Sequence, residues 1–112
     1  MSKQNIAIVG LGKSGTTFLN AILSKQSSVH LACAVEIMET PGKAQAAAAG
    51  VKIATMDELI AMGKDVDVIF DLTGQPGVVK ELRHKISSAF NGHTVVASEI
   101  ICHLVWALIV DA

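Results

Sequence analysis

The chain has 112 residues, of which 51% are hydrophobic and 17% are charged, and its formal net charge is −1. This length suits one domain with a hydrophobic core and is too short for two. The composition is typical of a globular protein rather than a disordered one. A near-neutral chain with few aromatic residues and no tyrosine offers neither an electrostatic footprint nor a stacking platform for nucleic acid, so we expect no nucleic-acid partner.

Both cysteines, Cys33 and Cys102, lie in apolar runs far apart in the sequence. We expect two buried, reduced thiols in a cytoplasmic protein, and no metal site, because no C-x-x-C pair is present. The first five residues lead straight into an apolar run, so we expect no signal peptide. The apolar run 100–110 is interrupted by His103 and is too short to span a bilayer.

The first apolar run, 6–9, leads directly into a G-x-G-x-x-G motif formed by Gly10, Gly12 and Gly15. Residues 16–23 then favour a helix. This order is typical of a buried strand that turns tightly into a helix whose N-terminus faces a phosphate. We expect Gly10 to permit the turn, Gly12 to let the backbone approach a pyrophosphate, and Gly15 to let the helix pack closely on the strand.

Lys13 and Ser14 lie inside this glycine loop, where backbone or side-chain groups are placed to contact phosphate. A Walker A motif requires G-x-x-x-x-G-K-[ST], which the loop does not supply, so ATP hydrolysis is not expected. The predicted phosphate-binding residues are Gly10, Leu11, Gly12, Lys13, Ser14 and Gly15.

Further apolar runs predict four more strands, at 29–35, 51–54, 67–72 and 93–97. The segments between them predict helices at 43–49, 56–62 and 78–90. Thr40-Pro41-Gly42 predicts a turn, and Thr55 with Glu58 predicts a capping box. The 78–90 helix is amphipathic, with a predicted buried face that consists of Val78, Val79, Leu82, Ile86 and Phe90.

Alternating strands and helices with long crossovers predict a parallel sheet covered by helices on both faces. We therefore expect one α/β domain over residues 1–112, a Rossmann-like three-layer α/β/α fold of about five strands in the order 3-2-1-4-5. The ligand crevice of such a fold lies at the carboxyl ends of strands 1 and 4.

Residues 99–112 are apolar on nearly every face. A sixth strand is one alternative, but Ser98 as an N-cap and Glu99 in the first turn favour a helix. A helix that is apolar all round is buried against something. We therefore expect this segment to form a homodimer contact or to continue into a partner domain, which makes the chain a fragment of a larger protein.

Glu36 follows the second predicted strand. A carboxylate at this place accepts hydrogen bonds from the adenosine ribose hydroxyls in dinucleotide-binding folds, although a solvated strand-end carboxylate is the alternative. The next cationic residue, Lys43, is seven residues away, and Glu36 and Glu39 repel a ribose 2′-phosphate. The sequence therefore favours NAD over NADP as the cofactor.

Asp71, Thr73, Gly74 and Gln75 follow the fourth strand, beside the predicted crevice. We expect the backbone and the hydroxyl of Thr73, together with Gly74, to face the nicotinamide half of the cofactor. A turn that leads into a helix at Pro76 explains the same residues equally well.

His103 lies four residues after Glu99, a spacing that permits an acid–base pair on one helix face. A lone histidine in an apolar helix is more often a packed or edge residue. We therefore assign neither a catalytic residue nor a metal ligand.

The sequence resembles the N-terminal cofactor domain of the glucose-fructose oxidoreductase/inositol dehydrogenase family. The resemblance rests on the glycine loop, the Ala34-Val35-Glu36 strand end, the segment from Val51-Lys52-Ile53 to Asp57-Glu58-Leu59, and Asp65-Val66-Asp67-Val68-Ile69-Phe70. Homoserine dehydrogenase and dihydrodipicolinate reductase have similar cofactor domains. The resemblance covers about residues 5–98 and implies an NAD(P)-binding domain of an oxidoreductase.

The chain departs from this family after the fifth strand. The family usually carries Glu-Lys-Pro there, with a catalytic lysine, whereas this chain has Ala97-Ser98-Glu99-Ile100. The substrate domain of the family is also missing. The resemblance thus implies a cofactor-binding half, and we expect the isolated chain to show no turnover.

Asp71-Leu72-Thr73-Gly74, followed by an apolar helix that contains Trp106, is also similar to Rossmann-like modules at the N-termini of some bacterial multidomain sensor proteins. That resemblance implies an alternative function, a non-catalytic module that senses a nucleotide or contacts a partner domain.

Overall fold

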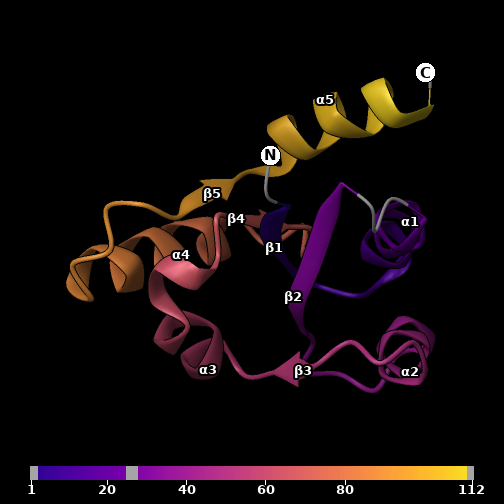
Figure 1. Ribbon diagram of the computed structural model, residues 1–112, viewed down its shortest axis with the longest axis horizontal. Coiled ribbons are helices and arrows are strands. Elements are labelled where there is room, and N and C mark those ends of the chain that lie inside the picture. The colour runs from indigo at the N-terminus through magenta and orange to yellow at the C-terminus, as the bar shows by residue number, and fades with distance from the viewer. Residues whose placement is uncertain (1–2, 25–27, 111–112) are drawn as a thin grey trace.

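The computed structural model describes residues 3–24 and 28–110 of the chain (Figure 1). Strands and helices alternate along these residues. Their order is β1 (Gln4–Val9), α1 (Lys13–Leu23), β2 (Val29–Val35), α2 (Pro41–Ala48), β3 (Ile53–Ala54), α3 (Met56–Ala61), the 3-10 helix η1 (Gly63–Asp65), β4 (Val68–Asp71), α4 (Pro76–Ser88), β5 (Val95–Ala97) and α5 (Glu99–Val110).

The five strands form one parallel sheet in the order β3-β2-β1-β4-β5. This confirms the predicted strand order and fold class. Strand β1 lies at the centre and pairs with both β2 and β4, so the loop that follows β1 opens between the ends of its two neighbours. The topology therefore brings the glycine loop, Glu36 and the residues after Asp71 to one edge of the sheet.

Helices α1 and α2 lie on one side of the sheet, and α3 and α4 lie on the other (Figure 1). Alternate side chains of β1 belong to the two resulting cores: Ile6 and Ile8 pack with residues of α1, whereas Ala7 and Val9 pack with residues of α3 and α4. Because successive side chains of a strand point to opposite faces, one apolar run serves both layers.

Helix α5 begins near the end of β5 and extends over the side of the sheet that carries α1 (Figure 1). Cys102 and Trp106 contact the same core as α1. The N–H of Cys102 donates to the Ser98 carbonyl at 3.0 Å, so the helix begins at Glu99 as predicted. None of the helices in the described residues is long and apolar enough to cross a membrane.

The face of α5 opposite to the core is exposed rather than buried. Ile100 is 79% exposed, and Leu104 and Leu108 are also exposed. Among the described residues, one face of α5 meets the core and the other is exposed, so the expected contact of this helix with a second copy or a partner domain stays a prediction.

Two local predictions are wrong. Thr40-Pro41-Gly42 is the start of α2 rather than a turn: the Thr40 hydroxyl accepts a hydrogen bond from the Lys43 N–H as an N-cap, and Pro41 occupies the first helical position. Gly42 packs so closely against α1 that a Cβ there would lie 2.0 Å from the Thr16 hydroxyl. A turn and an N-cap use the same residue types, so local sequence does not separate them.

Phe90 does not belong to the buried face of α4. The helix ends at Ser88, and Phe90 has a left-handed φ of 55° and is 93% exposed. The N–H groups of Phe90 and Asn91 donate to the carbonyls of Ser87 and Ile86, which is a Schellman motif. Because the helix ends in this C-cap, the helical period does not continue to Phe90, and its side chain stays outside the core.

Candidate functional site

The glycine loop is held tightly between the ends of three strands. Gly10 has a φ of +100°, and its N–H donates to the Val35 carbonyl at 2.8 Å. A Cβ at Gly10 would lie 2.9 Å from the Thr73 nitrogen, and one at Gly15 would lie 1.8 Å from the Gly10 oxygen. Both positions therefore require glycine, Gly10 for the turn and Gly15 for the contact between α1 and the loop.

The N-terminus of α1 is open. Gly12 is the N-cap residue and provides no side chain to accept from the first-turn N–H groups, which have no acceptor inside a helix. A Cβ at Gly12 would meet nothing within 4 Å, and Lys13 and Ser14 are exposed. An anion can therefore approach this helix end closely, and both the N–H groups and the helix dipole favour it.

The Glu36 carboxylate lies against the same loop. Its Oε1 accepts a hydrogen bond from the Leu11 N–H at 2.8 Å, and its Oε2 accepts one from the Met38 N–H at 3.1 Å. A carboxylate offers about four acceptor sites, so the half-buried Glu36 retains capacity for two hydroxyl donors. The backbone of Leu11 is fully engaged, since its carbonyl accepts from the hydroxyls of Thr16 and Thr40.

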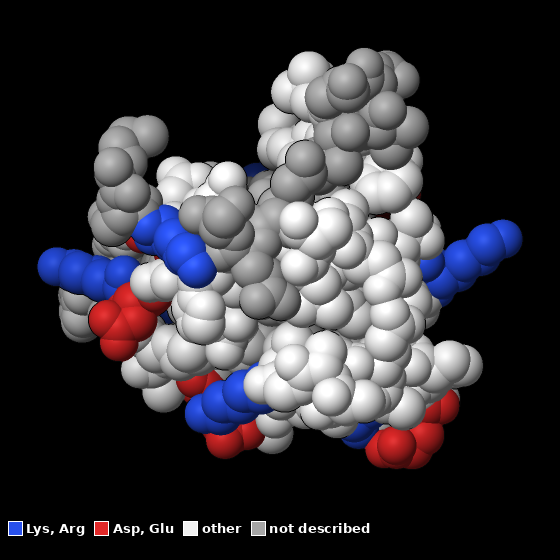
Figure 2. Space-filling view, turned by 45° about the vertical axis from the view of Figure 1, so that its right-hand side comes forward, with Lys and Arg blue, Asp and Glu red and all other residues white. Residues whose placement is uncertain are grey.

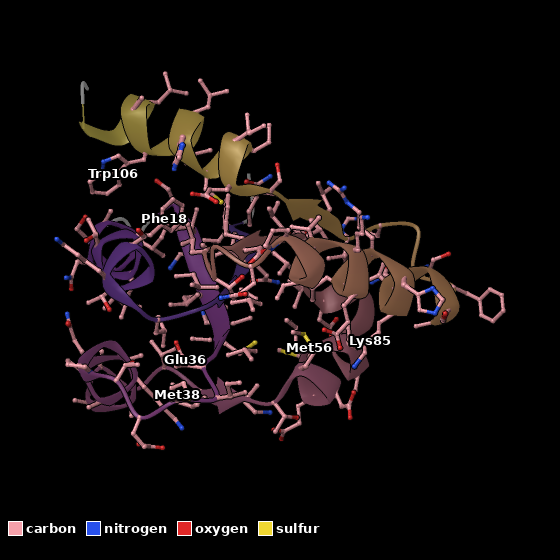
Figure 3. The ribbon with its side chains drawn as sticks, turned by 180° about the vertical axis from the view of Figure 1, so that it is seen from behind. Phe18, Glu36, Met38, Met56, Lys85 and Trp106 are labelled. Carbon is pink, nitrogen blue, oxygen red and sulfur yellow. The ribbon has the colours of Figure 1, made fainter. Side chains whose placement is uncertain are left out.

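A cavity of about 660 Å³ begins at the open helix end. Three parts of the fold form its walls: the start of α1, the loop after β4, and one face of α5. Figure 3 shows Trp106 extending from α5 toward α1, where Phe18 lies, while Glu36 lies further from α5. This volume falls within the range of about 300–1,000 Å³ that is typical of small-molecule sites.

The loop after β4 is fixed by Asp71, which is only 4% exposed. Its Oδ1 accepts hydrogen bonds from the Thr73 N–H at 3.0 Å and from the Thr73 hydroxyl at 2.7 Å. The Thr73 hydroxyl in turn accepts from the Gln75 N–H at 3.1 Å. Thr73 and Gly74 line the cavity, and Thr73 also shapes the turn before α4, so the structural role of these residues is confirmed.

Helix α5 contributes Glu99, Cys102, His103 and Trp106 to the cavity wall. The Nε2 of His103 lies 3.5 Å from Oε1 of Glu99, and both side chains are more than half exposed. Burial raises the pKa of the Cys102 thiol to about 11, and Asp71 and Glu99 add to this shift. Burial likewise raises the pKa of Cys33 to about 11, so both cysteines are free, protonated thiols at neutral pH.

The predicted site residues divide into three groups. Five of them line the cavity: Gly12, Lys13, Ser14, Thr73 and Gly74. Gly10 and Gly15 shape the loop from behind, and Leu11 is buried and positions Glu36. Glu36 lies outside the cavity lining, beyond the glycine loop, so an extended ligand that reached both would cross the open end of α1.

Sequence reasoning missed the contribution of α5 and Phe18 to this site. The spacing of Glu99, Cys102, His103 and Trp106 places them on one helix face, but it does not say what that face meets. Their role depends on where α5 crosses the sheet, which the pattern of apolar residues does not specify.

On the face shown in Figure 2, the coloured Lys and Arg side chains are scattered, several of them beside Asp or Glu, and form no continuous basic patch. Within residues 3–24 and 28–110, no three His, Cys, Asp or Glu side chains are grouped so that they could hold a metal ion.

A comparison with models of protein families shows the family of this chain. The model of the oxidoreductase family with an NAD-binding Rossmann fold matches residues 4–94. The chain belongs to this family. The match covers the glycine loop, Glu36 and the loop after β4, and it ends just before β5. The resemblance drawn from the sequence is therefore confirmed.

Solved structures of this fold include a putative myo-inositol dehydrogenase from Sinorhizobium meliloti, with 19% identity, a TM-score of 0.67, and coverage of 86% of this chain and 27% of that chain. Scyllo-inositol dehydrogenase from Lactobacillus casei, solved with NAD(H) and scyllo-inositol, has 23% identity and a TM-score of 0.65, with coverage of 87% of this chain and 28% of that chain. Homoserine dehydrogenase from S. aureus has 16% identity and a TM-score of 0.62, with coverage of 88% of this chain and 27% of that chain.

The chain thus spans little more than a quarter of the length of these structural relatives. At these identities the likeness shows the fold. No curated protein matches the chain significantly.

Proposed function

We propose that this chain binds NAD at the open end of α1 and along the adjoining cavity, as the dinucleotide-binding domain of an oxidoreductase. The observation that carries the proposal is the free approach at Gly12, where a Cβ would meet nothing within 4 Å, next to an uncapped helix N-terminus. A pyrophosphate is an anion that needs both close backbone approach and free N–H donors.

In this proposal, different residues around Gly12 bind different parts of the dinucleotide. Gly12, Lys13 and Ser14 hold the pyrophosphate, and Glu36 accepts from the adenosine ribose hydroxyls with its two remaining acceptor sites. The nicotinamide half then lies in the cavity, beside Thr73 and Gly74. Solved scyllo-inositol dehydrogenase, with bound NAD(H), supports a dinucleotide in this fold. When bound, the nicotinamide supplies hydride-transfer chemistry.

NAD is preferred over NADP in this proposal. A ribose 2′-phosphate would lie against the Glu36 carboxylate, and the nearest following cation, Lys43, is already paired with Glu39 at 2.8 Å. The Glu36 carboxylate would therefore repel a 2′-phosphate, and Lys43 is not free to offset this repulsion.

Calorimetric titration of the chain with NAD⁺ and NADP⁺ tests this proposal. We expect NAD⁺ to bind at least as tightly as NADP⁺, and Glu36→Gln to narrow the difference by removing the repulsion. Gln keeps an oxygen that accepts from the Leu11 N–H but replaces the oxygen that accepts from the Met38 N–H with an amide nitrogen. The thermal melting curve of the variant therefore checks that the loop stays in place. Failure of both dinucleotides to bind at millimolar concentration contradicts the proposal.

The substrate-binding half of the reaction, we propose, is supplied by polypeptide outside this chain. No catalytic residue is assigned here, because Ser98 and Glu99 stand where the resembled family carries its catalytic lysine. We accordingly expect no NAD-dependent oxidation of small alcohols by the isolated chain, and measurable turnover would contradict this. The buried free thiols Cys33 and Cys102 support a reducing, cytoplasmic location.

The alternative is a non-catalytic module that senses a nucleotide or contacts a partner through residues 99–112. The exposed apolar face of α5 favours it, because Ile100, Leu104 and Leu108 lie on the side of the helix away from the cavity. A module of this kind needs no substrate domain, so the two functions differ in whether the full-length protein contains one.

A further inference from the structure

The cavity beside the glycine loop is lined by charges of both signs. The N-terminus of α1 and Lys13, the only Lys or Arg among the described residues that line it, contribute positive charge. Glu99, on the first turn of α5, contributes negative charge, and Glu99 and Gly74 together line both this cavity and a smaller neighbouring hollow. The proposed function assigns the pyrophosphate to the start of α1 and the nicotinamide half to the side of Thr73 and Gly74, so Glu99 would act on the nicotinamide half.

A second carboxylate, that of Asp71, lies close to Glu99. Asp71 and Glu99 both line a smaller hollow of about 320 Å³, which shares Gly74 and Glu99 with the large cavity. The two carboxylates also act together on Cys102, whose pKa both of them raise. Among the described residues, this smaller hollow is lined by no Lys, Arg or His.

Among the described residues, few basic side chains lie near Glu99. The Nε2 of His103 lies 3.5 Å from the Glu99 carboxylate, and Lys13 lines the cavity from α1. The smaller hollow adds Asp71 and no basic side chain, so carboxylates predominate on this wall.

We propose that the site selects the oxidised dinucleotide, NAD⁺, over the reduced form, NADH, through the carboxylate of Glu99. The nicotinamide ring of NAD⁺ carries a positive charge, whereas the ring of NADH is neutral, and both forms carry the same pyrophosphate. An acidic wall therefore adds attraction to NAD⁺ alone, while the contacts at Gly12, Lys13 and Glu36 serve both forms equally.

This inference rests on the proposed function and specifies which oxidation state of the dinucleotide the site prefers. A site with this charge pattern is filled according to the oxidised fraction of the dinucleotide pool rather than according to the pool as a whole. Such selection requires neither a bound substrate nor a catalytic lysine.

Calorimetric titrations with NAD⁺ and with NADH, in mildly alkaline buffer where imidazole side chains are generally neutral, test the inference. We expect the wild-type chain to bind NAD⁺ more tightly than NADH by roughly three- to tenfold, as fits one charge–charge interaction at a half-exposed site. Glu99→Gln should bring the two affinities together, and Glu99→Lys should reverse their order. Added salt should reduce the wild-type difference.

Glu81→Gln is the matched control, since it removes one exposed carboxylate from α4, outside the cavity lining. It should leave the ratio of the two affinities unchanged. If the wild-type chain and the Glu99 variants all bind both forms with one common ratio, the inference is overturned and the proposed function stands. If the wild-type chain binds neither form, the proposed function itself fails.

Discussion

At the scale of single residues, we expect a substitution at Gly12 to lower ligand affinity strongly and to change stability little. Because a Cβ there meets open space, Gly12→Val places its methyl groups where the pyrophosphate approaches and leaves the protein core untouched. We expect dinucleotide affinity to fall by about a hundredfold or more through steric overlap. The unfolding free energy should fall by only about 1 kcal/mol or less, as for other changes at an N-cap.

Gly92→Val is the control for this prediction, because Gly92 also faces open space but lies in the loop before β5, away from the cavity. It should bind the dinucleotide as the wild type does. Calorimetry and urea denaturation on both variants give the two quantities, and undiminished binding by Gly12→Val would show that the ligand does not cross this loop.

At Gly15, three residues after Gly12, we expect a substitution to lower stability. A Cβ at this position would lie 1.8 Å from the Gly10 oxygen, so Gly15→Ala forces α1 away from the glycine loop. We expect the unfolding free energy, measured by urea denaturation, to fall by about 1–3 kcal/mol through overpacking. Gly12→Ala is the comparison, and equal stability of the two alanine variants would refute this account of the loop.

At the scale of elements, the C-terminus of α4 carries a local cost. Phe90 adopts a left-handed φ of 55° in a Schellman motif, a position where glycine is usual. Phe90→Gly should therefore raise the unfolding free energy by about 0.5–1 kcal/mol, since relief of backbone strain exceeds the added chain entropy.

Phe90→Ala separates the two causes in this experiment. It removes the same exposed ring but keeps a Cβ in the left-handed conformation. Thermal or urea unfolding should show a gain for glycine and none for alanine. Equal gains for both would assign the effect to loss of the ring rather than to the backbone.

Much of the element order follows from the sequence. The run 29–35 is apolar and bounded by polar residues, and β2 occupies the same residues; the capping box of Thr55 and Glu58 forms as predicted. The two wrong predictions have one cause: the same local sequence pattern is compatible with two different structures. Thr40-Pro41 suits both a turn and an N-cap, and Phe90 extends the helical period of α4 but ends the helix in a C-cap.

The candidate site was predictable on one side only. The glycine loop and Glu36 lie at strand ends, so the topology alone brings them together. The opposite wall, with Trp106 and Glu99, depends on the angle at which α5 crosses the sheet. That angle results from side-chain packing against Phe18 and its neighbours and has no periodic trace in the sequence.

At the scale of the whole molecule, α5 presents a cavity-lining face and an exposed apolar face. The expectation of a contact through residues 99–112 remains a prediction, and residues 111–112 lie outside the described residues. A second copy of the chain is the occupant that we test, because Ile100, Leu104 and Leu108 bring no charge that a symmetric contact would bury unpaired.

Sedimentation velocity over a range of concentrations measures this contact. We expect the wild-type chain to self-associate and Leu104→Lys to remain monomeric, because a lysine in the middle of the apolar face must be desolvated. Lys80→Leu, an apolar change on exposed α4, is a control that should not alter association through α5. A wild-type chain that stays monomeric at all concentrations would contradict the prediction.

The central claim is that the chain binds a nicotinamide dinucleotide with the ring inside the cavity. Trp106 is the single tryptophan of the chain and lines that cavity, so it is an intrinsic reporter. Titration with NADH should quench Trp106 fluorescence saturably and produce matching sensitised emission from the reduced nicotinamide, and Gly12→Val should abolish both changes. Absence of any saturable change at millimolar NADH, in a folded wild-type chain, would contradict the claim.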